Sequence, residues 1–215
     1  MARAERHSSA TSIDRRTFWL RRLHSLTGIL PIGLYVIIHL GINSFAASGA
    51  ETYDEVAEFL ESLPYLILIE IPLIWAPILY HSIYGIYIHA TGKPNPLQYT
   101  YANNEMYWLQ RWSGIVSLIF IGWHFWQTRL ANYLYGTPIE FEMMARIFAE
   151  PGWVAFYVVG LVAVSFHFAN GLRTFLLTWG LVVGTRARVV AAKVAAVFGA
   201  LVLAVSLAAI WAFIR

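Results

Sequence analysis

Four histidines lie within long apolar stretches of the 215-residue sequence, one in each of four consecutive stretches: His39, His81, His124 and His167. An ionisable side chain is costly inside a membrane, so such residues mark functional sites by default. A single one is better explained as a packed side chain hydrogen-bonded to a neighbouring helix. Four of them favour metal chemistry, because two neutral imidazoles from facing helices can hold one b-type haem iron. The set therefore predicts two haem b groups.

Five apolar segments are long enough to cross a membrane as helices, which takes about 20 mostly apolar residues. The sequence is 59% hydrophobic and 13% charged, whereas a soluble domain has about 25% charged residues. This composition predicts an all-α membrane bundle of five transmembrane helices. It forms one haem-binding domain over 18–215, after a polar cytoplasmic tail over 1–17. The predicted helices cover 23–46, 62–90, 110–131, 152–180 and 189–214.

The sequence contains no cysteine. Disulfides, thiolate-bound zinc, iron–sulfur clusters and covalently attached c-type haem are therefore excluded within this chain. It also has no glycine-rich dinucleotide fingerprint. The small basic excess is an effect of membrane topology and not of nucleic-acid binding, because the basic residues flank the apolar segments.

The basic residues predict the orientation of the bundle, because the cytoplasmic ends of spanning segments carry an excess of Lys and Arg. The excess here lies before the first segment and in the second and fourth loops. The N-terminus is therefore expected in the cytoplasm and the C-terminus outside. The basic residues on the expected inner side are Arg3, Arg6, Arg15, Arg16, Arg21, Arg22, Lys93, Arg111, Arg186, Arg188 and Lys193.

The first loop, "GAETYDEVAEFLESLP" over 49–64, has no basic residue and several acidic ones. Its apolar residues fall at helical spacing. This predicts an amphipathic helix that lies flat on the outer surface before Pro64 opens the second span.

Chain direction predicts which histidines share a depth. With a rise of 1.5 Å per residue, His39 lies roughly 25 Å and His124 roughly 20 Å above the arginines that begin their segments. The second and fourth segments run in the opposite direction, so His81 and His167 lie towards the inner side. We therefore expect an outer pair, His39 with His124, and an inner pair, His81 with His167.

Two carboxylates lie near the expected outer pair. Glu70 is about three turns from His81 on the same helix face, either as a proton relay or as the structural partner of a basic group. Glu61 lies at the outer mouth of the second span. It is either a proton donor and acceptor for a quinone or a solvated loop carboxylate.

Four further polar residues are candidates for binding a cofactor or a quinone. Arg173, two turns below His167, and Arg129 could each pair with a haem propionate. His24 and Ser25 lie at the inner end of the first segment, where they could bind a propionate or a quinone head group.

Seven stretches within 17–190 together carry a resemblance to a known family. They read "FWLRRLHSLTGILPIG", "IIHL", "FAASGAE", "ESLP", "YHSIYGIYI", "LQRWSGIVSLIFIGWHFWQTR" and "FHFANGLRTFLLTWG". The sequence resembles the one-subunit, five-helix, two-haem cytochrome b anchors of succinate:quinone oxidoreductases, the succinate dehydrogenases and fumarate reductases. The resemblance implies His39 and His124 as ligands of the distal haem, and His81 and His167 as ligands of the proximal haem.

The resemblance also implies a location and partners. The location is a bacterial cytoplasmic membrane, where lipid surrounds the chain and flavoprotein and iron–sulfur subunits on the cytoplasmic side carry the succinate and fumarate chemistry. Electrons would pass from the iron–sulfur subunit through the two haems to a quinone, commonly menaquinone in two-haem members. Glu61 matches a carboxylate associated with the distal quinone site in relatives. Oligomerisation of the whole complex is compatible with this interpretation, and a nucleic-acid partner is not expected.

One position departs from some fumarate reductases, which have a glutamate two residues before the fourth-span histidine for a transmembrane proton path. Ser165 stands there in this sequence, so the chain lacks that carboxylate. Two other functions are alternatives. One is the two-haem cytochrome b of another membrane oxidoreductase, such as a formate dehydrogenase or a hydrogenase. The other is a colourless transporter or scaffold whose histidines line a proton pathway.

Overall fold

The computed structural model describes the backbone of residues 2–92 and 102–215, and the side chains of residues 15–92, 102 and 104–215. Lys93, counted above among the inner basic residues, lies outside the described residues, as do the side chains of Arg3 and Arg6. Every regular element in the described part of the chain is a helix. The predicted all-α class is therefore confirmed.

The first long helical unit contains one proline, Pro31, at the junction between two α-helices. Helix α1 (Ala2–Ile29) is followed by α2 (Pro31–Asn43) and by a short 3-10 helix, η1 (Ser44–Ser48). The proline that begins α2 has no N–H to donate. The helix nevertheless continues through the junction, because Leu34 N donates to Leu30 O at 3.2 Å.

The second and third units each contain one π-helical turn, an arrangement often found at functional sites. The turn in the second unit begins directly after Glu70, and the turn in the third unit contains Arg129. The second unit consists of α4 (Leu66–Glu70), η2 (Ile71–Trp75) and α5 (Ala76–Thr91). The third unit consists of α6 (Ala102–Phe125), η3 (Trp126–Leu130) and α7 (Ala131–Tyr135).

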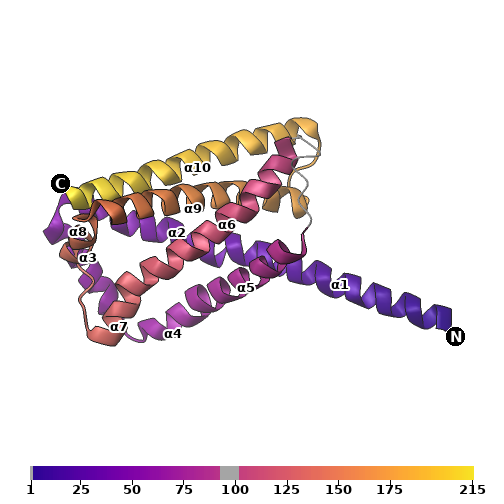
Figure 1. Cartoon of the computed structure of the whole chain (residues 1–215), viewed down its shortest axis with the longest axis horizontal. Coiled ribbons are helices and arrows are strands. Elements are labelled where there is room, and N and C mark those ends of the chain that lie inside the picture. The colour runs from indigo at the N-terminus through magenta and orange to yellow at the C-terminus, as the bar shows by residue number, and fades with distance from the viewer. Residues whose placement is uncertain (1, 93–101) are drawn as a thin grey trace.

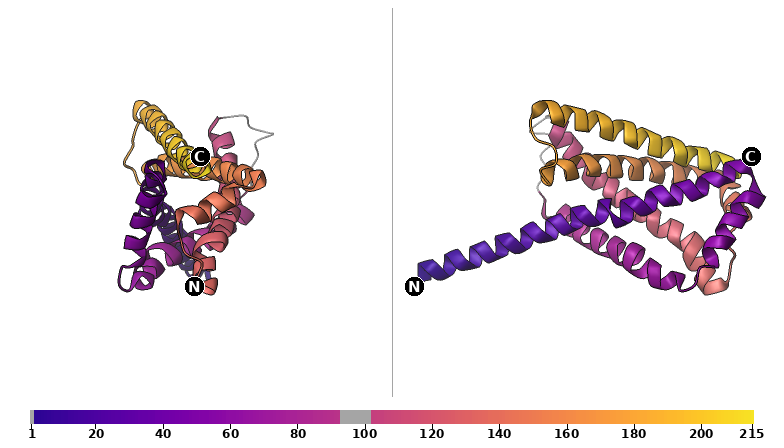
Figure 2. Two further views of the ribbon diagram at one scale, coloured as in Figure 1. Left: turned by 90° about the vertical axis from the view of Figure 1, so that its left-hand side faces the viewer. Right: turned by 180° about the vertical axis from the view of Figure 1, so that it is seen from behind.

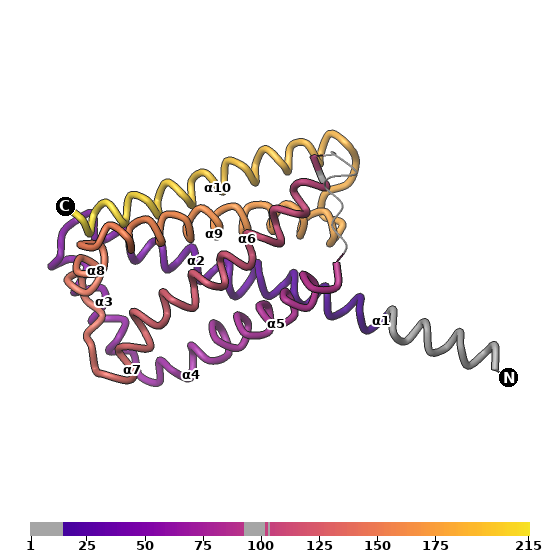
Figure 3. The backbone as a smooth tube through the Cα atoms, in the orientation of Figure 1, coloured from indigo at the N-terminus to yellow at the C-terminus, as the bar shows by residue number. Residues whose placement is uncertain are grey.

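Helix α9 (Pro151–Thr178) packs between α6 and α10 (Thr185–Ile214) (Figures 1 and 2). The backbone trace in Figure 3 shows that α9 and α10 run antiparallel along nearly their whole length. They approach closely through small residues, as membrane helices commonly do. A Cβ atom at Gly199 would lie 2.7 Å from the Cβ atom of Ala169.

Four helical units in the described part of the chain are long and apolar enough to cross a membrane: Arg15–Ser48, Leu66–Thr91, Pro151–Thr178 and Thr185–Ile214. They correspond to four of the five predicted segments. The remaining prediction, 110–131, falls on α6 and η3 and is helical. Its mean hydropathy is lowered by arginines at 111 and 129 and glutamines at 110 and 127. The count of five spans and the orientation of the termini therefore stay predictions.

Two short helices, α3 (Ala50–Glu61) and α8 (Phe141–Phe148), cover the end of the bundle at which α10 ends (Figure 1). The amphipathic helix predicted in the first loop is thus present as α3, with Tyr53 and Ala57 buried. The second helical unit does not begin at Pro64 as predicted. It begins at Leu66, because the preceding residue, Tyr65, adopts the left-handed conformation with a φ of 59°.

These two short helices, the cap, contribute to a cluster of buried apolar side chains. Burial, together with the nearby charge of Asp54, raises the pKa of the Tyr53 hydroxyl to about 12. Asp54 Oδ1 accepts a bond of 2.6 Å from Phe141 N, which ties α3 to the start of α8. The cluster contains Ala46, Tyr53, Ala57, Phe120, Met144, Phe148, Tyr157, Ile210, Ala212 and Phe213.

Candidate functional site

The four intramembrane histidines form two pairs inside the bundle. His39 on α2 faces His124 on α6, with ring centroids 5.8 Å apart and ring planes at 73°. His81 on α5 faces His167 on α9, with centroids 6.2 Å apart and planes at 85°. These are the same partners that chain direction predicts. The role of the four as haem ligands stays a prediction.

The ring separations fit a shared metal ion in each pair. Because imidazole nitrogens bind first-row metals at about 2 Å, two rings on opposite sides of one ion have centres roughly 6 Å apart. The donor set of each pair is two neutral imidazoles, which suits the iron of a b-type haem. The residues present therefore fit one haem iron per pair.

Hydrogen bonds to Nδ1 at the inner pair leave the other ring nitrogen, Nε2, available to bind a metal. His81 Nδ1 lies 3.0 Å from the main-chain oxygen of His24, and His167 Nδ1 lies 3.0 Å from that of Gln110. A carbonyl oxygen can only accept, so both Nδ1 atoms carry the proton. Both Nε2 atoms are left free for a metal, with the ring orientation held as in known metal-binding histidines.

A cavity of about 280 Å³ contains the inner pair and is also lined by His24 and Ser25. Two glycines allow the histidine rings to lie where they do. A Cβ atom at Gly28 would lie 2.6 Å from His81 Cε1, and one at Gly114 would lie 2.8 Å from His167 Cε1. Any larger residue at these positions displaces a histidine ring.

His24 and Ser25, predicted to bind a propionate or a quinone, thus lie at the inner cavity. The His24 ring stacks on the His81 ring, with centroids 4.0 Å apart and planes at 11°. Its Nε2 atom is buried and has no hydrogen-bond partner among the described residues. A buried nitrogen of this kind is costly unless a ligand pairs with it, which is consistent with the predicted binding role.

A chain of side-chain hydrogen bonds leads from Arg173 to the inner pair. Arg173 Nε donates to Asn170 Oδ1 at 3.0 Å, and Asn170 Nδ2 donates to Gln110 Oε1 at 2.9 Å. Gln110 Nε2 donates to the main-chain oxygen of His167 at 3.0 Å. The sequence reasoning missed Gln110 and Asn170. The signal for Asn170 was its position one turn after His167 on a long apolar helix.

The outer pair is held by side chains. His124 Nδ1 lies 3.2 Å from the Tyr157 hydroxyl, which donates to Gln127 Oε1 at 3.3 Å. The Asn43 amide donates to the main-chain oxygen of His39 at 2.8 Å and lies 3.4 Å from His39 Nε2. The sequence reasoning also missed Tyr157, because nothing in the sequence relates a residue near the start of α9 to His124.

Two carboxylates beside the outer pair are bridged by one arginine. Arg129 Nη2 lies 2.7 Å from Glu70 Oε1, and Arg129 Nη1 forms an ion pair with Glu61. Glu70 is buried and also accepts a bond of 2.6 Å from the Tyr133 hydroxyl. Of the two roles weighed for Glu70, this is the arrangement of a structural partner to a basic group. Arg129 is engaged by carboxylates here, and its propionate role stays a prediction.

Ser165, at the position that holds a glutamate in some fumarate reductases, is 3% exposed. Its hydroxyl oxygen has no hydrogen-bond partner among the described residues. The position therefore offers a buried hydroxyl and no carboxylate.

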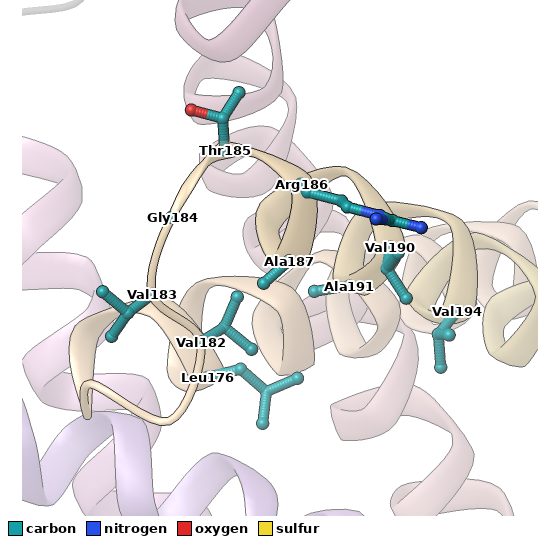
Figure 4. Close-up of a pocket in the computed structure, with 10 residues that line it drawn as sticks. All are labelled: Leu176, Val182, Val183, Gly184, Thr185, Arg186, Ala187, Val190, Ala191 and Val194. Atoms are coloured by element: carbon teal, nitrogen blue, oxygen red, sulfur yellow. The ribbon is translucent and has the colours of Figure 1, made fainter.

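A second hollow lies at the turn between α9 and α10 (Figure 4) and contains none of the histidines. Leucine, valine and alanine side chains line it, with Arg186 and Thr185 at its edge. None of the candidate cofactor-binding or quinone-binding residues named above lines it.

Comparison with known proteins gives two matches. Residues 95–209 match the model of the succinate dehydrogenase/fumarate reductase transmembrane subunit family. Over 199 residues, the chain is 44% identical to the succinate dehydrogenase cytochrome b558 subunit of Bacillus subtilis (strain 168). That alignment covers 93% of this chain and 98% of the relative.

Proposed function

Because this chain belongs to the family of succinate dehydrogenase and fumarate reductase transmembrane subunits, we propose a function for it within such a complex. It is the membrane-anchor cytochrome b of a succinate:quinone oxidoreductase. It carries electrons between an iron–sulfur subunit and membrane quinone, with two b haems. The observation that supports this most directly is the pairing of four intramembrane histidines at 5.8 and 6.2 Å.

The histidine pairs are the proposed haem ligands. When bound, a b haem supplies a one-electron carrier. His81 and His167 hold the inner, proximal haem, and their Nδ1 protons are bound by main-chain oxygens. His39 and His124 hold the outer, distal haem. At His81, His167 and His124, the contacts of Nδ1 fix the ring orientation and increase the basicity of the ligand nitrogen.

The partners are a flavoprotein subunit and an iron–sulfur subunit on the cytoplasmic side. They carry the succinate and fumarate chemistry, since this chain has no cysteine to hold a cluster. The arginines at 15, 16, 21 and 22 support this side as the cytoplasmic one. Arg22 is held at the end of the bundle, its guanidinium 5.2 Å from the ring centre of Trp179.

The quinone, proposed to be menaquinone, reacts at the outer end of the bundle. Glu61 is the proposed proton donor and acceptor there, because its side chain is 36% exposed whereas that of Glu70 is 11% exposed. Arg129 bridges the two carboxylates.

Haem content of the purified complex tests this function. A pyridine haemochrome assay should find two haem b groups per copy of the chain. Replacing His39, His81, His124 or His167 singly with alanine should remove one haem each. His89→Ala is the matched control, because its ring packs against Trp112 and belongs to neither pair.

Two results would contradict the proposal. A wild-type complex with fewer than two haems would overturn the two-haem function, and a colourless one would favour the proton-pathway alternative. If His89→Ala lost a haem and His39→Ala did not, the ligand assignment would be wrong.

A further inference from the structure

The two histidine pairs differ in what accepts the Nδ1 proton. Both inner histidines donate to main-chain oxygens, which no side-chain substitution removes. His124, in the outer pair, has a side-chain hydroxyl as its partner at 3.2 Å, that of Tyr157. A single substitution can therefore change the hydrogen bonding of one outer ligand and leave the inner pair untouched.

The proposed ligand role fixes the direction of this bond. With His124 Nε2 on the haem iron, a neutral imidazole carries its proton on Nδ1. Nδ1 therefore donates to the Tyr157 hydroxyl oxygen, which lies 3.2 Å away, and the hydroxyl donates its own proton to Gln127 Oε1 at 3.3 Å.

Burial holds the Tyr157 hydroxyl in this position. Tyr157 is 3% exposed. Its ring packs edge-on against Phe148 and Phe120, with centroids 4.9 and 5.3 Å away. Because the phenol ring is enclosed on several sides, its hydroxyl remains beside His124.

We propose that Tyr157 is a positioning residue that tunes the outer haem through His124. This inference rests on the proposed function, because it takes His124 as a haem ligand. A hydrogen-bond acceptor at Nδ1 makes imidazole a stronger base and a stronger donor to the metal. Stronger donation stabilises the more positive, oxidised iron. The bond from His124 to Tyr157 therefore lowers the reduction potential of the outer haem.

Redox titration of the purified complex tests this inference. In Tyr157→Phe, the equilibrium constant for reduction of the outer haem should rise by about threefold to tenfold, the value of one hydrogen bond. At about 59 mV per tenfold change for one electron, this is a rise of about 30–60 mV. The inner haem should keep its potential. The outer haem is identified as the one that His124→Ala removes.

Tyr53→Phe is the matched control. It removes a hydroxyl from the same buried cluster, where the Tyr53 ring packs against Phe213 and Phe141, and it should shift neither potential. Gln127→Leu removes the acceptor that orients the Tyr157 hydroxyl. It should shift the outer potential upwards by a smaller amount, with ring and hydroxyl both retained.

The outcomes separate this inference from the proposed function. Two haems with an unchanged outer potential in Tyr157→Phe, or equal shifts of both haems, would overturn the role of Tyr157 alone. If Tyr157→Phe loses the outer haem, Gln127→Leu decides: an upward shift supports the role, and an unchanged potential overturns it. Fewer than two haems in the wild-type complex would instead overturn the proposed function.

Discussion

The inner and outer histidine pairs have similar ring separations, but different groups surround their rings. The inner pair lies in a cavity where glycines touch the rings, and main-chain oxygens accept both Nδ1 protons. The outer pair lies beside an aromatic cluster, with a side-chain hydroxyl as acceptor and a bridged pair of carboxylates nearby. The inner site should therefore be sensitive to added volume. The outer site should be sensitive to the loss of particular polar side chains.

The largest expected effect comes from adding volume at the inner pair. Gly28→Leu places a side chain where a Cβ atom alone would lie 2.6 Å from His81 Cε1. The His81 ring must move, so the complex should lose the inner haem and keep the outer one. The pyridine haemochrome assay should then find one haem b per chain in place of two.

Gly41→Leu is the matched control, since a Cβ atom at Gly41 would have no atom within 4 Å apart from those of its own helix turn. It should retain both haems. Loss of a haem in both variants, or in neither, would contradict the importance of glycine at the inner pair.

A smaller but substantial effect is expected from the ion-pair bridge near the outer pair. Arg129→Met leaves Glu70 buried without its cation. Breaking one side of a buried pair costs about 3 kcal/mol in free energy of unfolding. Thermal denaturation of the complex in detergent should show this loss. Adding Glu70→Gln should restore much of the stability, because no uncompensated charge then remains.

Arg146→Met provides the comparison for an exposed pair. Arg146 and Glu142 are 76% and 57% exposed, and solvent screening leaves such a pair with little effect on the free energy of unfolding. Equal losses of stability from Arg129→Met and Arg146→Met would show that the bridge near the outer pair contributes no more to stability than an exposed ion pair.

The smallest of these effects is expected at the cap. Asp54→Ala removes the acceptor for Phe141 N at the start of α8. Loss of a helix-capping acceptor costs about 1 kcal/mol. Asp54→Asn keeps an acceptor oxygen and should cost less. Thermal denaturation of both variants, with haem content unchanged at two per chain, would confirm that the cap is separable from the haem sites.

The features of the fold that the sequence predicts correctly are those that depend on the residue pattern within a single helix. Long apolar segments with one histidine each, and the helical spacing of the loop over 49–64, are local patterns that the structure retains as helices. Chain direction was enough to pair His39 with His124 and His81 with His167. The start of the second helical unit was misplaced at Pro64, because the left-handed turn at Tyr65 is set by how α3 meets α4 and not by a residue-type preference.

The sequence by itself determined the helical class and the histidine that each of four segments carries, because apolar length and residue spacing are properties of each segment alone. Only the tertiary structure decided what each polar group contacts. It brought the main-chain oxygens of His24 and Gln110 to the inner pair, and Tyr157 to His124. These partners depend on how each helix is rotated about its axis and how closely it approaches its neighbours. Packing against other segments determines that rotation, and the order of residues in any one segment does not encode it.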